Sequence, residues 1–175
     1  MTAALSYFEM GATCIADPTW PSRPPGFRSY EQTIRIGHGE RHWETAAAAV
    51  QEWAVKTRSG FTVQPAEVNE GARVRQGQNY TLVASFGPFR LREPVQVVSI
   101  VEGPDRCGFA YGTRPGHPVT GEEAFIVHRH QDDSVWLTLR SLTRPGVGRW
   151  RFAFPAALVA QRWYRRRYTR ALVQR

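Results

Sequence analysis

Hydrophobic and polar positions divide the chain into stretches of different periodicity. Residues 1–28 contain four prolines and few regularly spaced apolar residues, which predicts an extended arm lying on the core. Apolar and polar residues alternate over 29–36, as in a strand with one buried face. In 40–56 the apolar residues recur every three or four positions, which predicts a single amphipathic helix that ends before Gly60.

From 61 to 144 the apolar period shortens to two, and turn residues separate short β-rich segments. The connections are too short for crossover helices, so these segments predict an antiparallel meander. The expected strands are 61–64, 72–75, 79–86, 95–101, 107–112, 123–130 and 135–143. A helical pattern over 155–173, with Pro155 in its first turn, then predicts a helix roughly 30 Å long.

This order of elements predicts an α+β fold. A curved antiparallel sheet cannot leave its apolar face open, and a long amphipathic helix would cover that face. The arrangement is that of a helix-grip fold of the Bet v 1/START-like class, a curved antiparallel β-sheet wrapped around a long C-terminal helix. That class usually has two short helices after the first strand, whereas the pattern here gives one. We expect a single domain over 1–175, with the arm at 1–28, a strand, helix and meander over 29–150, and the C-terminal helix within 154–175.

Composition narrows the class of protein further. A chain of 175 residues with 42% hydrophobic residues is long enough to form a packed globule. No apolar run reaches the ~20 residues of a membrane helix, and no signal-peptide pattern is visible at the start. The two cysteines, Cys14 and Cys107, have neither zinc-site nor disulfide-framework spacing, so we expect a reducing, cytoplasmic compartment.

The formal net charge of +8 raises the hypothesis of a polyanionic partner. Lys56 is the only lysine among 23 cationic residues, and so strong an arginine bias can reflect genome composition rather than selection for phosphate binding. We expect a bacterial protein. Binding of nucleic acid or an anionic surface is therefore kept as an alternative rather than as the leading hypothesis.

Segment 108–125 carries four glycines and two prolines in the middle of the predicted sheet. Glycine permits backbone angles that other residues avoid and proline fixes its own, so this density predicts a shaped loop that directs particular side chains. Such loops carry function more often than the framework does. Its candidate binding residues are Tyr111, Thr113, His117, Glu122 and Glu123.

Several motifs along the chain resemble the signature of the uncharacterised family DUF1990, also called UPF0548. The most specific is the Tyr-Gly-Thr-x-Pro-Gly-His-Pro core at 111–118, and similar segments occur at 5–13, 25–27, 35–39, 136–140 and 161–168. Arg114 stands where the resemblance leads us to expect an apolar residue, and Thr143 where we expect serine. The resemblance covers almost the whole chain and implies the helix-grip fold, but the family has no established activity.

Glu122 and Glu123 are neighbours on a predicted strand, so their side chains point to opposite faces and at most one can face a cavity. A buried carboxylate needs a cation or several donors, and Arg140 and Arg144 are the expected partners in a structural ion pair. A general base with a raised pKa is the alternative.

His117, held between Gly116 and Pro118, is either a general acid/base near neutral pH or a ring that bonds loop carbonyls and fixes the turn. Tyr111 either donates its hydroxyl to a ligand or packs in the core. His128 and His130 share one strand face and have metal-ligand spacing, but no third ligand is placed. We therefore predict no metal site, and no motif indicates a cofactor.

The C-terminal helix interleaves aromatic residues and arginines. At helical spacing, Trp163 and Tyr164 fall on the inner stripe, and Arg167 should also point towards the sheet. Most of the other arginines lie on the outer face, which is the surface available to a polyanion.

The leading hypothesis is binding of a small, partly apolar molecule between sheet and helix. The polar contacts would come from the central segment together with Arg140, Arg144 and Arg167, and the walls from Trp136, Trp163 and Tyr164. Two alternatives stay open: a lyase, cyclase or hydrolase using His117 or a glutamate, and a nucleic-acid or anionic-surface binder. The same aromatic rings can also fill the interface as solid core. The oligomeric state is left open.

Overall fold

The computed structural model describes residues 5–65, 71–86, 88–148 and 150–174. Within these ranges seven antiparallel strands form one sheet in the order β1-β7-β6-β5-β4-β3-β2. The strands are β1 Arg28–His38, β2 Phe61–Gln64, β3 Asn79–Phe86, β4 Phe89–Glu102, β5 Arg106–Thr113, β6 Val119–Arg129 and β7 Ser134–Pro145. The helices are α1 Glu40–Gln51, α2 Ala54–Thr57 and α3 Trp150–Tyr168.

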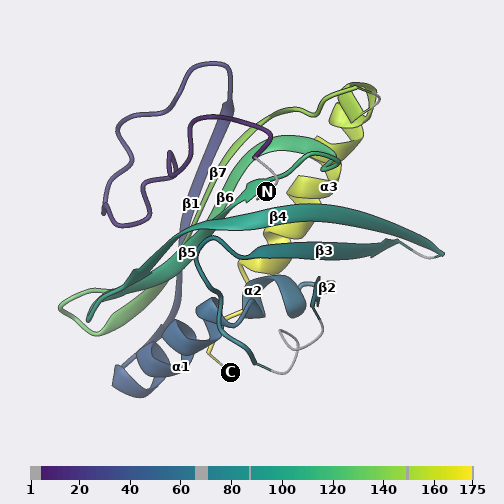
Figure 1. Ribbon diagram of the computed structural model, residues 1–175. Coiled ribbons are helices and arrows are strands. Elements are labelled where there is room, and N and C mark those ends of the chain that lie inside the picture. Colours follow the sequence, from purple (N-terminus) through teal and green to yellow (C-terminus); the bar gives the residue numbers. More distant parts are fainter. Residues whose placement is uncertain (1–4, 66–70, 87, 149, 175) are drawn as a thin grey trace.

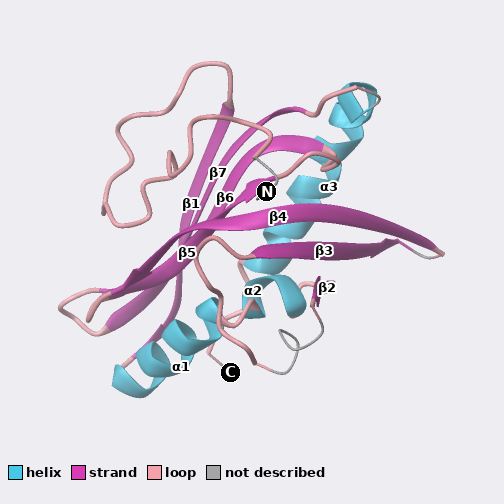
Figure 2. Ribbon diagram, viewed as in Figure 1, coloured by secondary structure: helices cyan, strands magenta, loops and turns pink. Residues whose placement is uncertain are grey.

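The curved sheet has helices on one face and the N-terminal arm on the other (Figures 1 and 2). Residues of α1, α2 and the C-terminal region around α3 join one apolar cluster with Phe109 of β5 and Phe125 of β6. On the opposite face, Ile15 of the arm packs with Ala110 and Ile126. This arrangement confirms the predicted α+β helix-grip fold.

The predicted helix over 40–56 is interrupted, which corrects the expectation of a single helix. Trp53 adopts a left-handed backbone conformation with φ of 61°, and it separates α1 from α2. This conformation costs roughly 1–2 kcal/mol in a residue other than glycine. The indole is buried against the rings of Tyr80, Phe109 and Tyr111, at centroid distances of 5.0, 4.7 and 5.6 Å. We infer that this packing offsets the backbone cost.

Other boundaries differ from the sequence prediction. Segment 72–75 is not a strand, because the Val74 N–H donates to the carbonyl of Gln51 at the end of α1 instead of to a neighbouring strand. Strand β4 begins six residues before the predicted start at residue 95. Helix α3 begins at Trp150, so Pro155 lies at an exposed position inside the helix and not in its first turn.

Segment 108–125, predicted as a shaped loop, is mostly the β5–β6 hairpin, with residues 114–118 as its connection. Its glycines allow the arm and the neighbouring strand β7 to approach the hairpin backbone closely. A Cβ atom at Gly112 would collide with the phenol of Tyr7 in the arm, and one at Gly121, where φ is 147°, would collide with the carbonyl of Leu142 on β7. The glycine density therefore reflects tight packing of the arm and neighbouring strands as well as turn formation.

Glu122 of β6 binds the N-terminal arm to the face of the sheet opposite the helices. Its carboxylate accepts hydrogen bonds from the Tyr7 hydroxyl at 2.7 Å, the Gly11 N–H at 2.8 Å and the Thr13 N–H at 3.0 Å. The Thr13 hydroxyl also donates to it. Several donors on a buried carboxylate are what its desolvation requires.

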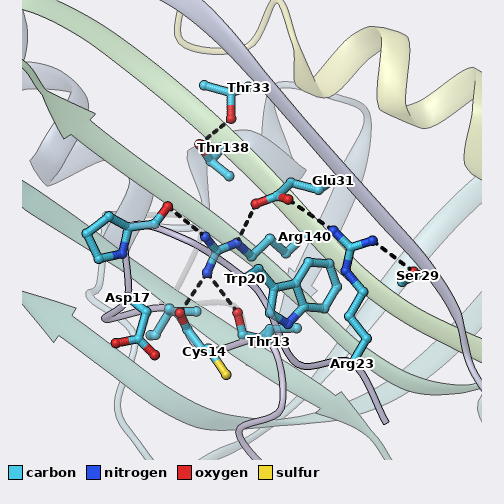
Figure 3. Close-up of polar contacts among 12 residues, drawn as sticks. Thr13, Cys14, Asp17, Trp20, Arg23, Ser29, Glu31, Thr33, Thr138 and Arg140 are labelled. Carbon is cyan, nitrogen blue, oxygen red and sulfur yellow. Dashed lines mark hydrogen bonds and ion pairs between the residues drawn. The ribbon is translucent and has the colours of Figure 1, made fainter. Parts of the chain in front are cut away.

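Arg140 fastens the next part of the arm (Figure 3). Its guanidinium donates to the carbonyls of Thr13, Cys14 and Pro18 at 3.1, 2.7 and 3.2 Å. The Nε atom donates to Glu31 of β1 at 3.0 Å, which is also an ion pair. The side chain is only 1% exposed, so nearly all of this binding capacity is used inside the protein.

Candidate functional site

A cavity of about 250 Å³ lies between the sheet and α3. Four alanines at helical spacing are part of its α3 wall, and their small side chains leave space that larger residues would fill: Ala153, Ala156, Ala157 and Ala160. Phe61, Leu91 and Val119 line other parts of it, and Tyr164 lies among the lining residues as predicted. The interface between sheet and helix is therefore not filled completely by side chains.

Lys56 is the charged centre at one end of this cavity. It comes from α2, is 3% exposed, and places its ammonium 2.8 Å from a carboxylate oxygen of Glu123 on β6. It also donates to the Tyr168 hydroxyl at 2.6 Å. The rings of Phe61 and Tyr168 lie with their centroids 4.4 and 4.7 Å from the ammonium, close enough for cation–π attraction.

Glu123 stays ionised in this setting. Burial by itself would raise its pKa, but the charge of Lys56 and hydrogen bonds from Lys56 and Tyr111 outweigh burial, and the net pKa is lowered. Burial and the Glu123 charge raise the pKa of Tyr111 well above its usual value, so its hydroxyl acts as a donor to that carboxylate. The structure thus places Tyr111 both in the packed core and on the cavity wall.

Glu93 of β4 is a second carboxylate at the same end. Burial raises its pKa to about 7, with the charge of Glu123 adding to the rise and that of Lys56 opposing it. One of its oxygens lies 3.8 Å from Nε2 of His117. Near neutral pH Glu93 therefore exists in both protonated and ionised forms.

His117 is buried and lies on the cavity wall. Its Nδ1 accepts a hydrogen bond from the Val119 N–H at 3.1 Å, so the partner is a backbone amide and not a loop carbonyl. Burial, followed by the charge of Lys56, lowers the pKa of His117 to about 3. A neutral ring with Nδ1 already bonded is a poor general base, which weakens the enzyme hypothesis at this residue.

Thr113 borders the cavity and ties the hairpin to the arm. Its hydroxyl accepts from the Gly121 N–H at 2.9 Å and shares a hydrogen bond with the Ser6 hydroxyl at 2.6 Å. Glu122 also borders the cavity, but its hydrogen bonds go to the arm on the opposite face. The two neighbouring glutamates thus diverge as strand alternation predicts. Neither pairs with Arg140 or Arg144 in the described structure, which corrects the expected partners.

Three predicted site residues of β7 do not line the cavity. Successive residues of a strand alternate between faces, so Trp136, Arg140 and Arg144 share the face that the arm occupies. Trp136 stacks on His130 with a centroid distance of 5.5 Å, and the Arg144 guanidinium lies 4.5 Å from the Phe27 ring centroid.

Two predicted residues of α3 are also outside the cavity. Trp163 is 48% exposed, and the exposed guanidinium of Arg167 lies 4.7 Å from its ring centroid. Arg165 faces the sheet instead, where it donates to the Ser141 hydroxyl at 2.9 Å. The inner stripe runs through Ala157, Ala160, Tyr164 and Tyr168, so the prediction is right for Tyr164 and wrong for Trp163 and Arg167.

The sequence prediction missed Lys56, Glu93 and the α3 alanines as cavity residues. The sequence could have identified Lys56 as a buried residue, because it is the only lysine and lies three residues after Trp53, on the apolar stripe of the predicted helix. Glu93 could have been identified too, since it shares strand phase with Leu91 and Val95, but the predicted strand began after it.

The described residues contain no group of three or more potential metal ligands. The two histidines proposed as a pair have other contacts: His128 shares a hydrogen bond of 3.0 Å with the Thr138 hydroxyl, and His130 stacks on Trp136. None of the described helices is long and apolar enough to span a membrane.

Removing Lys56 should expose the energetic role of the buried pair. We expect Lys56→Met to lower the free energy of unfolding by about 3 kcal/mol at pH 7, because Glu123 loses its cation. The double variant Lys56→Met/Glu123→Gln should be less destabilised than the sum of the single variants, with a coupling energy of about 1–3 kcal/mol. Urea unfolding measures all four proteins.

The matched control is the exposed pair Arg73–Glu102, whose charged atoms lie 3.1 Å apart. The cycle of Arg73→Met and Glu102→Gln should give a coupling energy of at most about 0.5 kcal/mol. Additive effects of the Lys56 and Glu123 substitutions would contradict the assignment of the buried pair.

Glu93 predicts a pH dependence of stability. Its pKa is about 7 in the fold against 4.5 as the ordinary value, so the folded protein binds the extra proton between these values. The contribution of Glu93 to the free energy of unfolding is therefore fully present below pH 4.5 and is lost as pH rises through 7. Glu93→Gln should match the wild type at pH 4.5 and exceed its free energy of unfolding by up to about 3 kcal/mol at pH 8.

Urea unfolding of both proteins from pH 4.5 to 8 checks this difference. Glu44→Gln, on the exposed face of α1, is the control and should leave the curve unchanged. A difference between Glu93→Gln and wild type that stays constant with pH would refute the raised pKa.

Comparison with one solved structure supports the fold. A hypothetical protein from Helicobacter pylori, jhp0584, aligns with a TM-score of 0.57 and 10% identity over 87% of this chain and 89% of that one. A crystal structure of Ara h 8.0201 aligns with a TM-score of 0.49 and 10% identity, over 84% of this chain and 99% of that one. At 10% identity the likeness to jhp0584 concerns architecture alone.

Sequence comparison identifies the family. A UPF0548 protein of Deinococcus radiodurans is 37% identical over 98% of this chain and 87% of its own length. A UPF0548 protein of Arabidopsis thaliana is 24% identical over 85% of this chain and 73% of its own length. The family model described as a domain of unknown function, DUF1990, matches residues 6–171. The chain therefore belongs to the DUF1990 family, whose curated relatives are called UPF0548 proteins.

Proposed function

We propose that this protein binds a small, partly apolar molecule in the cavity between the sheet and α3. The observation that carries the proposal is a cavity of about 250 Å³ with an alanine wall on one side and a charged, hydrogen-bonded cluster at one end. Binding pockets for small molecules combine such apolar walls with a few fixed polar groups.

The volume limits the size of the ligand. An apolar cavity of ~150 Å³ takes up benzene, and pockets for drug-sized ligands begin at ~300 Å³. A cavity of about 250 Å³ therefore fits a substituted ring or a short branched chain, and it is too small for a long lipid chain. The apolar body would lie against Ala157 and Ala160, with Phe61 and Leu91 among the other wall residues.

The polar end favours a neutral ligand group over a carboxylate. Lys56 is already paired with Glu123 at 2.8 Å, so it is not free to pair with a ligand carboxylate, and an ionised Glu93 adds a negative charge beside it. A ligand carboxylate would be repelled there. A hydroxyl can instead accept from a protonated Glu93 or donate to an ionised one, and it can also accept from the Nε2–H of neutral His117.

The enzyme hypothesis receives less support from the same geometry. His117 is held neutral by burial, Glu122 is bonded to the arm, and Glu123 is paired with Lys56. Glu93, with a pKa of about 7, is the residue to which an acid–base role would fall. A binding protein accounts for all four side chains without requiring a reaction.

The test uses two probes that share one apolar body, 4-propylphenol and 4-propylbenzoate. We expect 4-propylphenol to bind the wild type at least tenfold more tightly than 4-propylbenzoate at pH 7.5, as measured by calorimetry. Ala157→Phe should weaken 4-propylphenol binding at least tenfold, because the phenyl ring fills the cavity beside α3.

The matched control is Ala48→Phe, the same change on the exposed face of α1. It should bind 4-propylphenol as the wild type does, and circular dichroism should show both variants folded. Undiminished binding to folded Ala157→Phe, or no binding of any probe to the wild type, would count against the proposal.

A further inference from the structure

A second hollow of about 500 Å³ lies between β1 and α3, beside the cavity. It shares Thr143 and Gln161 with the cavity, and the Gln161 side-chain amide donates to the Thr143 hydroxyl at 3.4 Å between them. We call this hollow the arginine groove, because four arginines line it and no acidic residue does: Arg28, Arg162, Arg165 and Arg166.

Arg165 forms a fixed part of the groove. Its guanidinium carbon lies 3.6 Å from the centroid of the Tyr30 ring, and one terminal nitrogen donates to the Ser141 hydroxyl at 2.9 Å. A guanidinium carries five N–H donors, so stacking and one hydrogen bond orient the group without using up its donors. Arg165 is thus held in place by both β1 and β7.

The other arginines of the groove are exposed and unpaired. Within the described part of the chain, Arg28, Arg162 and Arg166 make no ion pair with a carboxylate. Arg162 and Arg166 are four residues apart on α3, and like charges at this spacing destabilise a helix. Arg28 adds a third positive charge from the opposite wall on β1.

We propose that the arginine groove is a binding site for the phosphate or diphosphate group of a small molecule. An oxyanion between the two walls would relieve the repulsion among these cations and meet guanidinium donors that suit its geometry. The site differs from the apolar cavity, so this inference does not depend on the proposed function.

The concave shape favours a small anion over a nucleic acid. Positive side chains line a hollow between a strand and a helix, whereas single-stranded nucleic acid is bound along an extended basic track with exposed aromatic rings for stacking. Tyr30, the aromatic residue lining the groove, already stacks on Arg165. The ligand would therefore bind in the groove through its phosphate oxygens and not by stacking on an aromatic ring.

The test measures binding of sodium pyrophosphate by calorimetry at constant ionic strength. We expect saturable binding to the wild type and a loss of at least tenfold in affinity for Arg162→Gln/Arg166→Gln. Arg28→Gln, on the opposite wall, should lose at least threefold. The control is Arg151→Gln/Arg170→Gln, which removes the same charge from exposed positions outside the groove and should lose less than twofold.

Three outcomes would overturn the inference: no pyrophosphate binding to the wild type, equal loss in the control and groove variants, or an unaffected Arg28→Gln. The competing arms use a single-stranded oligothymidine and vesicles containing phosphatidylglycerol. Tighter binding to either, with no displacement by pyrophosphate, would assign the arginines to a macromolecular or membrane surface instead. Ala157→Phe should bind pyrophosphate as the wild type does, which separates this site from the cavity.

Discussion

The ammonium of Lys56 links three of the elements that surround the cavity. It comes from α2, pairs with Glu123 of β6 and donates to Tyr168 of α3, all within 2.8 Å. Burying two charges is costly, and here the cost is offset by their proximity, by two tyrosine hydroxyls and by aromatic faces around the cation. The charges of this cluster must keep their hydrogen-bond and ion-pair partners in place. The surrounding side chains therefore cannot move inward to fill the cavity, as they could in a purely apolar core.

The alternation of β6 connects this cluster to the arm on the other face. Glu123 faces the helices, while the adjacent Glu122 accepts hydrogen bonds from Tyr7, Gly11 and Thr13. The arm motif at 5–13 and segment 108–125 therefore meet in space, although the residues in contact are 109–115 positions apart in the sequence. Part of the family signature therefore consists of residues that pack the arm against the sheet, and not only of residues that line the cavity.

The sequence predicted the architecture because strand alternation and helical spacing are local signals. Strands 61–64 and 79–86 have the predicted bounds, since apolar alternation and turn residues define both ends. The break at Trp53 depends on how its indole packs against β3 and β5, which no local pattern reports. The position of Glu93 on the cavity wall required knowing that β4 extends back to residue 89.

Choosing site residues by their side-chain chemistry was less successful than choosing them by the face of the strand on which they lie. Arg140 and Trp136 were attractive as a cation and an aromatic wall, yet strand alternation puts both on the arm face. On α3, adjacent residues are separated by about 100° around the axis. Arg165 and Arg167 are therefore about 200° apart, and the predicted stripe included Arg167, which is exposed, and left out Arg165, which faces the sheet.

The most direct test of the account is to locate a bound ligand in the cavity by nuclear magnetic resonance. The protein would carry labelled alanine methyl groups, and intermolecular NOEs would be measured in the complex with 4-propylphenol. We expect NOEs from the propyl group to the methyls of Ala157 and Ala160 of α3, which line the cavity. NOEs confined to exposed alanines such as Ala48, with none to Ala157 or Ala160, would contradict it.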